Sequence, residues 1–343
     1  MSATELSSGP YREAALRVAV KNLYIYVVLL LIVAGFSLVR LGEVELFGPG
    51  HFLSPDSLIN MLRTSAPILT VSSAFTLLMI AGYIDLSVGS AMSLTAVIFA
   101  LLVREGAPFA LAFAAAAALG VGLGALNGFL VMRLRITPVI ATLVTLSLYK
   151  GSALLIVPSG LSAIKGRPGR PMPAWINDYS RAEVLLGLPW AFYIALLVIA
   201  ALVVVQRRTL VGRYAAAIGG NRTAAELSGI DPVRWVWGLY VVVGLCAALA
   251  GAARASYMSL GDPLSGDGME LDCIIAVLLG GTAFAGGEGS VGKTAVGALI
   301  IVCVTTGLMT VIPAFWQTFA KGSVLIGAVA LNQLLTRDRP KLA

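Results

Sequence analysis

The sequence predicts an all-α protein that crosses a membrane about ten times. Hydrophobic residues make up 58% of the 343 residues, and charged residues only 12%. A soluble domain usually carries about 25% charged residues, so roughly half of the expected charge is missing. The mean hydropathy of +0.92 is also more apolar than a soluble core of this length needs. Composition therefore places the chain among the polytopic membrane proteins.

Ten apolar stretches supply the expected crossings. Several approach the roughly 20 residues that a helix needs to cross about 30 Å of hydrocarbon. The first follows a basic leader over residues 1–21, but it is too long for a signal-peptide core and lacks a small-residue cleavage site, which favours a retained helix. Two, 88–103 and 270–286, are short or interrupted by glycine. In chain order the stretches are 22–39, 64–82, 88–103, 108–132, 136–157, 189–206, 235–254, 270–286, 294–312 and 316–335.

The basic residues between these stretches predict the orientation. If the N-terminus is cytoplasmic, 14 Lys and Arg residues fall on cytoplasmic segments and 6 on outer segments, as the positive-inside rule favours. Ten crossings then leave both termini in the cytoplasm, including the tail 336–343. With the outer loop 158–188 as the divide, two halves of five helices would be inverted relative to each other. We expect one transmembrane domain over residues 22–335.

The remaining composition argues against other classes of site. The net charge of +7 is spread between apolar runs and forms no basic stripe with interleaved aromatic residues, so it does not indicate nucleic-acid binding. The three cysteines, Cys246, Cys273 and Cys303, lie inside apolar runs, and His51 is the single histidine. These residues form no metal-ligand spacing. We expect no metal and no cofactor.

One motif suggests an enzyme. Residues 287–294 match the phosphate-binding loop pattern G-x-x-x-x-G-K-[ST], ending in Lys293 and Thr294. A working loop joins a buried strand to a helix and needs a carboxylate near Mg²⁺. The helix expected after Thr294 carries no charge up to Ile312, and the only acidic residue after it is Asp338. We therefore interpret the match as a glycine-rich connector and expect ATP hydrolysis to reside on a separate subunit.

The inner loop 207–234 is the longest polar segment on the cytoplasmic side. Thr223 and Glu226 have the spacing of a capping box, Gly229 is a plausible left-handed stop, and Pro232 prevents continuation. This pattern predicts a short surface helix over about residues 223–228. The helix is either part of an ordinary solvated loop or a docking element for a cytoplasmic partner.

Acidic residues interrupt two apolar runs. An ionised carboxylate at membrane depth costs roughly several kcal/mol of free energy, so Asp85 should face protein or water. Asp85 either caps a helix that starts at Leu86 or contacts a transported molecule. Glu270 and Asp272 open a short span that ends in Gly280 and Gly281; they either cap that helix or face a pathway. Polar or small residues that also bear on a pathway or on a helix break are Ser87, Gly89, Asn127 and Thr142.

Five motifs together resemble the permease subunits of ribose-type sugar importers of the ATP-binding cassette (ABC) class. The resemblance covers roughly residues 58–335, in the family's order. The motifs are IDLSVGS (Ile84–Ser90), LNGFLV (Leu126–Val131), ITPVIATL (Ile136–Leu143), GRYAAAIGGNRTAAELSGI (Gly212–Ile230) and ELDCIIAVLLGGTAFAGGEGS (Glu270–Ser290). The chain departs from the usual pattern at Tyr83 and Lys293, where glycine is common, and at Cys273 and Ile275, where alanine is common.

The resemblance implies a bacterial inner-membrane permease that forms the pathway for a monosaccharide. Its implied partners are a cytoplasmic ATP-binding subunit, a periplasmic sugar-binding protein and a second permease chain. The segment Gly212–Ile230 would be the coupling region against the ATPase, with Gly212, Arg213, Asn221, Thr223, Ala224, Ala225, Glu226 and Gly229 as its residues. A permease for branched-chain amino acids or nucleosides and an ion-coupled secondary transporter remain the alternatives.

Overall fold

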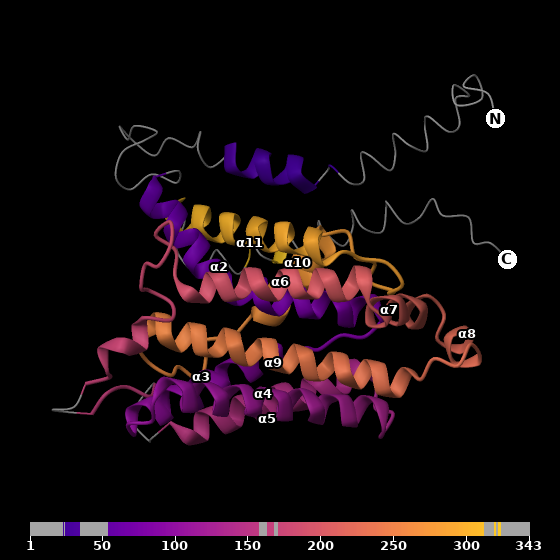
Figure 1. Cartoon of the computed structure of the whole chain (residues 1–343), viewed down its shortest axis with the longest axis horizontal. Helices are drawn as coiled ribbons and strands as arrows, with labels where there is room; N and C mark the ends of the chain where they lie inside the picture. The colour runs from indigo at the N-terminus through magenta and orange to yellow at the C-terminus, as the bar shows by residue number, and fades with distance from the viewer. Residues whose placement is uncertain are drawn as a thin grey trace.

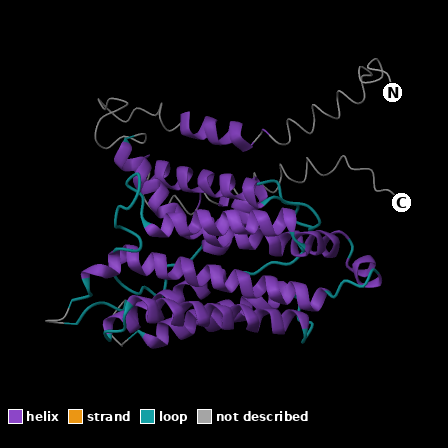
Figure 2. Ribbon diagram, in the orientation of Figure 1, coloured by secondary structure: helices purple, strands orange, loops and turns teal. Residues whose placement is uncertain are grey.

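The structure, a computed structural model, describes residues 23, 25–34, 54–157, 163–167, 171–311, 319 and 322–323. Within these residues all regular elements are helices, joined by loops and two isolated bridges (Figure 2). A helix spans Ile25–Ala34. The others are α2 (Pro55–Ile80), α3 (Val88–Arg104), α4 (Phe109–Met132), α5 (Pro138–Ile156), the 3-10 helix η2 (Ala174–Asn177), α6 (Trp190–Arg208), α7 (Leu210–Gly220), α8 (Arg222–Leu227), α9 (Pro232–Met258), α10 (Met269–Leu279) and α11 (Val291–Val311).

Local sequence explains where the longest helices begin. Ser54 caps α2 by accepting a hydrogen bond from the Ser57 backbone N–H at 3.2 Å. Asp231 caps α9 in the same way, accepting from the N–H groups of Val233 (2.9 Å) and Arg234 (3.3 Å). In both helices proline occupies the first position, where its missing N–H has no helical partner to lose.

The long helices lie side by side as a bundle, and α7 and α8 lie at one end of it (Figure 1). Helix α2 is central and packs against α6, α9, α10 and α11. It is rich in buried hydroxyl groups, most of which bond to a carbonyl about one turn back; examples are Thr70 to Ala66 at 2.8 Å and Ser73 to Leu69 at 2.6 Å. These polar groups therefore need no water inside the apolar bundle.

Glycines allow α4 and α9 to touch through their backbones. A Cβ atom added at Gly120 would collide with the carbonyl of Gly244 and the side chain of Ala248, and one at Gly124 would collide with the backbone of Tyr240. Trp237 of α9 then donates from Nε1 to the carbonyl of Ala125 at 3.0 Å. Small residues that bring helices into close contact are typical of packing inside membranes.

Five helices, α2, α4, α5, α6 and α9, are long and apolar enough to cross a membrane. This confirms a polytopic all-α protein. Helix α2 begins nine residues before the expected 64, since Ser54 and Pro55 start it. The stretch 316–335 lies almost entirely outside the described residues, as do both termini. The count of ten, the inverted halves and the cytoplasmic termini therefore stay predictions.

The glycine interruption expected in the span 270–286 is present, because the helix stops before Gly280 and Gly281. Helix α10 has only 11 residues and ends at Leu279. Gly281 follows with φ +78°, a backbone conformation that glycine adopts without steric cost. The chain then loops to Val291, where α11 begins three residues earlier than expected. The helix after Asp85 likewise begins at Val88 rather than Leu86.

Candidate transport cavity and coupling surface

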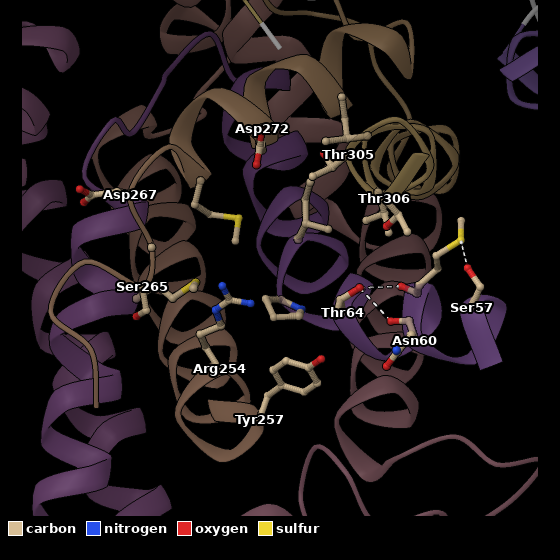
Figure 3. Close-up of a pocket in the computed structure, with 18 of the residues that line it drawn as sticks. Ser57, Asn60, Thr64, Arg254, Tyr257, Ser265, Asp267, Asp272, Thr305 and Thr306 are labelled. Atoms are coloured by element: carbon tan, nitrogen blue, oxygen red, sulfur yellow. Dashed lines mark hydrogen bonds between the residues drawn. The ribbon is translucent and has the colours of Figure 1, made fainter. Parts of the chain in front are cut away.

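A cavity of about 640 Å³ lies at the end of the bundle opposite α7 and α8. Its walls come from the first turns of α2, the end of α9, the loop before α10, the first turn of α10 and the C-terminal half of α11. Figure 3 shows the polar side chains that converge on it. These include Asn60, Thr64, Arg254, Tyr257, Ser265, Asp272, Thr305 and Thr306, whereas the carboxylate of Asp267, at the rim, points away from the cavity.

The cavity offers both hydrogen-bond donors and acceptors. The guanidinium of Arg254 extends into it between Ser265 and Thr64 (Figure 3). Arg254 Nε and Ser265 Oγ are buried and have no hydrogen-bond partner within the described part of the chain. Unsatisfied buried polar atoms are costly, so both atoms favour a polar occupant. Apolar walls from Met92 and the α2 and α11 helices complete a site suited to a small ligand with many hydroxyl groups.

The two acidic residues at the start of α10 have different surroundings. Asp272 lines the cavity, whereas Glu270 lies beside α3. A Cβ atom added at Gly89 would collide with the carbonyl of Gly266 and with the Glu270 carboxylate, so Gly89 is a point of close packing between α3 and the loop before α10. In addition, Lys150 of α5 pairs with Asp267 in that loop at 2.6 Å. The loop at the cavity mouth is therefore held from two sides.

Asp85, Ser87 and Asn127 form one buried network. Asp85 is 2% exposed, and its Oδ1 accepts from the backbone N–H (2.9 Å) and hydroxyl (2.7 Å) of Ser87. Asn127 of α4 donates from Nδ2 to Asp85 Oδ2 at 3.0 Å, and Tyr149 of α5 donates to Asn127 Oδ1 at 3.3 Å. These contacts pin the turn between α2 and α3 to two other helices. None of these four residues lines the cavity.

Thr142 is also buried, in α5, and donates to the carbonyl of Pro138 at 2.7 Å. Gly280 and Gly281 line a second cavity, of about 580 Å³, near α7. Its other walls include Gln206, Gly212, Arg213, Ala216, Glu288, Ser290 and Lys293.

The short surface helix exists as α8, one residue earlier than expected. The capping-box interpretation is wrong: Asn221 is the N-cap and accepts from the Ala224 N–H at 3.0 Å, which leaves Thr223 inside the helix. Glu226 instead accepts from Arg222 Nε at 3.0 Å, one turn back. This hydrogen bond raises the pKa of the Arg222 guanidinium, which therefore stays protonated. Gly229 has the expected left-handed conformation, with φ +82°.

Helix α8 presents an apolar contact point that the sequence alone did not single out. Leu227 is 86% exposed, whereas Ala225 is buried against the bundle. Single exposed leucines are common, but this one lies on a capped helix that projects from the end of the bundle (Figure 1). Its side chain therefore faces away from the bundle.

Glycines also form a junction where three segments meet without side chains between them. Gly219 lies at the end of α7, Gly82 in the α2–α3 turn, and Gly286 and Gly287 in the loop before α11. A Cβ atom at Gly219 would collide with the carbonyl of Ile80 and with the Gly287 nitrogen. Gly287 itself donates to the Ile80 carbonyl at 2.8 Å. We call Gly82, Gly219, Gly286 and Gly287 the glycine junction.

The match to the phosphate-binding loop has a different geometry from a working one. The segment before it, Ile274–Leu279, is part of helix α10 rather than a strand. Thr294, which would face Mg²⁺ in a nucleotide site, is fully buried and shares a 2.9 Å hydrogen bond with Thr76 of α2. Lys293 and Thr294 lie in the first turn of α11. The segment is therefore the end of the loop between α10 and α11 together with the first turn of α11.

Residues 57–330 match the family model described as "Branched-chain amino acid transport system / permease component". The chain is 32% identical over 305 residues to the ribose import permease protein of Haemophilus influenzae, covering 87% of this chain and 91% of the relative. It is 33% identical over 296 residues to the fructose import permease protein of Bifidobacterium longum, covering 83% and 81%. It is 32% identical over 346 residues to a probable ABC transporter permease protein of Escherichia coli K12, covering 99% of each.

No solved structure matches the chain. The similarity to the Escherichia coli permease spans 99% of the chain and therefore includes α2 to α11, with both the cavity and the glycine junction. The chain belongs to the family of membrane permease components of transport systems whose model spans its residues 57–330.

Proposed function

We propose that the chain is the membrane-spanning permease subunit of an ATP-driven ABC importer, and that it carries a monosaccharide. The observation that carries this proposal is the similarity to permeases named for ribose and fructose import, which extends over most of this chain. The cavity is compatible with such a cargo, because hydroxyl, amide and guanidinium groups can all bond to sugar hydroxyls. We place the cavity at the periplasmic end, where a sugar-binding protein delivers the substrate.

In this proposal the protein has ten helices with both termini in the cytoplasm and works in the bacterial inner membrane as a pair of permease chains. A cytoplasmic ATP-binding subunit docks on the α7–α8 region. Gly212, Arg213, Asn221 and the α8 residues form the docking surface, with Leu227 as the apolar anchor.

The glycine junction provides the route by which movement of α7 and α8 is transmitted to the cavity. Movement of α7 and α8 reaches Ile80 and Gly287 by direct backbone contact, with no flexible side chain between them. The loop 280–290 connects this junction to α10, and α10 carries Asp272 into the cavity at its other end. Displacement of α10 as a rigid unit would therefore change the cavity when ATP binds, which is the alternating-access scheme.

A permease for a branched-chain amino acid is the second candidate. The cavity contains both a cation, Arg254, and a carboxylate, Asp272, which together suit a zwitterion. The family description names the same substrate class. We prefer the sugar because the similar permeases that cover most of the chain are named for sugars.

Uptake by the reconstituted complex tests the proposal. The permease, its ATP-binding subunit and its periplasmic binding protein are assembled in proteoliposomes, and uptake of radiolabelled ribose, fructose and leucine is measured with ATP or with an imposed proton or sodium gradient. We expect ATP-dependent uptake of a monosaccharide. Uptake of leucine alone would favour the second candidate, and uptake driven by a gradient without ATP would refute the ABC assignment.

A further inference from the structure

Tyr83 connects the surface helix α8 to the turn between α2 and α3. Its hydroxyl accepts a hydrogen bond from Arg222 Nη1 at 2.9 Å, and its side chain is only 8% exposed. Arg222 is held in place by Glu226 on its own helix at 3.0 Å. Within the described residues this is the only side-chain hydrogen bond between α8 and that turn.

The turn that Tyr83 belongs to is anchored on its other side. The next residue, Ile84, accepts a hydrogen bond at its carbonyl from the hydroxyl of Tyr240 in α9, at 3.0 Å. Asp85 follows with its bonds to Ser87 and Asn127. A force applied at the phenol is therefore passed to a segment that the Ile84 carbonyl and the Asp85 carboxylate hold to α9 and α4.

This segment leads directly to the mouth of the cavity. Helix α3 begins at Val88, and Gly89 in its first turn packs against Gly266 and Glu270. Ser93, one turn later, accepts a 2.9 Å hydrogen bond from the Gly266 N–H. Gly266 lines the cavity. A continuous set of contacts thus runs from Arg222 through Tyr83, the buried network and the start of α3 to the cavity wall.

We infer that Tyr83 is a positioning residue for transport, which through its bond to Arg222 makes the start of α3 follow the movement of α8. The inference rests on the proposed function, because it assumes that a partner moves α8. The glycine junction transmits the same movement by contact, which can push but not pull. The Tyr83–Arg222 bond can also pull, because a hydrogen bond to a charged donor resists separation.

Substitutions that remove only the bond test this inference in the reconstituted complex. Tyr83→Phe keeps the ring and deletes the hydroxyl, and Arg222→Met deletes the donor. The matched control is Tyr214→Phe, in α7, whose hydroxyl has no hydrogen bond among the described residues and whose ring meets Trp235 edge-on. The measured quantities are ATP hydrolysis, uptake, the ratio of substrate moved to ATP consumed, and the melting temperature of the complex.

We expect Tyr83→Phe to lower the ratio of substrate moved to ATP consumed, because loss of one hydrogen bond to a charged group shifts the equilibrium between coupled and uncoupled arrangements of α8 and the turn about tenfold. The melting temperature should fall by only about 2–4 °C, and the amount of ATP-binding subunit bound by this variant should stay unchanged. Arg222→Met should lower the ratio of substrate moved to ATP consumed by the same factor, and the double substitution should lower this ratio no further than either single one, because both remove one bond. Tyr214→Phe should keep the wild-type ratio.

Two results separate this inference from the proposed function. If Tyr83→Phe keeps the wild-type ratio while Leu227→Asp abolishes ATP-driven uptake, the role of Tyr83 is refuted and the docking surface stands. If Leu227→Asp also keeps wild-type binding and uptake, the docking surface itself is refuted. A loss caused by Tyr83→Phe that is additive with the loss caused by Arg222→Met would equally overturn the inference, since the two residues would then act separately.

Discussion

Truncation of Leu227 to alanine should weaken binding of the cytoplasmic ATP-binding subunit without destabilising the permease. Leu227 is 86% exposed, so few of its contacts are within the chain. If docking buries the side chain, Leu227→Ala removes three carbon atoms from the interface. At about 0.8 kcal/mol per buried carbon, the loss is roughly 2 kcal/mol. This corresponds to an affinity about thirtyfold lower.

The assay measures affinity directly. The purified permease is immobilised in lipid nanodiscs and titrated with the ATP-binding subunit by biolayer interferometry, and its melting temperature is recorded separately. Leu155→Ala is the matched control: Leu155 is 87% exposed, but it lies in the last turn of α5, far from α8 in the bundle. Its substitution should leave the affinity unchanged.

Two outcomes would refute the reasoning. Unchanged affinity in Leu227→Ala would show that the partner does not cover this residue. Equal weakening by Leu155→Ala would show that the effect arises from the loss of any exposed apolar group, for example through altered lipid contacts, rather than from docking.

Three further predictions follow from the close contacts inside the protein. Gly219→Ala should block assembly of the glycine junction and abolish uptake, whereas Gly220→Ala, whose Cβ would meet nothing within 4 Å, should keep wild-type uptake; similar uptake by the two variants would argue against the junction. Asn127→Ala removes two hydrogen bonds that its amide donates to the buried Asp85 network. It should lower the free energy of unfolding by about 1–3 kcal/mol, measured as a melting temperature several degrees lower. An unchanged melting temperature would indicate that water replaces the amide. The purified permease alone should not bind ATP in a filter-binding assay and should not hydrolyse it in a phosphate-release assay. Lys293→Ala should leave both results unchanged. ATP hydrolysis that disappears with Lys293→Ala would mean that the glycine-rich loop is a nucleotide site.

The helices were largely predictable because a membrane restricts what an apolar stretch can do. Without water, backbone groups must bond within their own segment, so a stretch such as 108–132 becomes a helix, and α4 spans Phe109–Met132. The left-handed residue at Gly229 was predictable for a similar reason, since glycine is favoured there. Both predictions depend on residues close together in the chain.

The parts that were not predictable depend on contacts between distant residues. Asn221 and Thr223 are both good N-caps, and the sequence does not say which of them the end of α7 will place at the first turn of α8. Arg254 is another example. It sits at the end of an apolar run and carries no motif, yet the approach of α2, α10 and α11 makes it part of the cavity. Leu227 is significant only because α8 projects from the bundle, which no local pattern indicates.

The structure also contains an internal similarity between the end of α2 and the end of α10. At the end of α2, the N–H groups of Ala81, Gly82 and Tyr83 bond to the carbonyls of Leu77, Met79 and Leu78. At the end of α10, those of Gly280, Gly281 and Thr282 bond to Ala276, Leu278 and Val277 in the same pattern. Gly82 and Gly281 are both left-handed, with φ of +84° and +78°. In each case Ser-Val-Gly, at 87–89 and 290–292, leads into the next helix.

The two similar turns lie where movement of α7 and α8 would reach the rest of the bundle. Both turns lie at the end of the bundle near α7: Gly82 packs on Gly219, and Gly281 lines the cavity beside Gly212. The helices that lead away from them, α3 and α11, and the short α10 all reach the polar cavity at the opposite end. A single displacement of α7 and α8 would therefore act on two similar broken helices at once, from two sides of the same cavity. A coupling element that moved only one of them would shift one wall, whereas this arrangement lets one partner open and close the cavity as a whole.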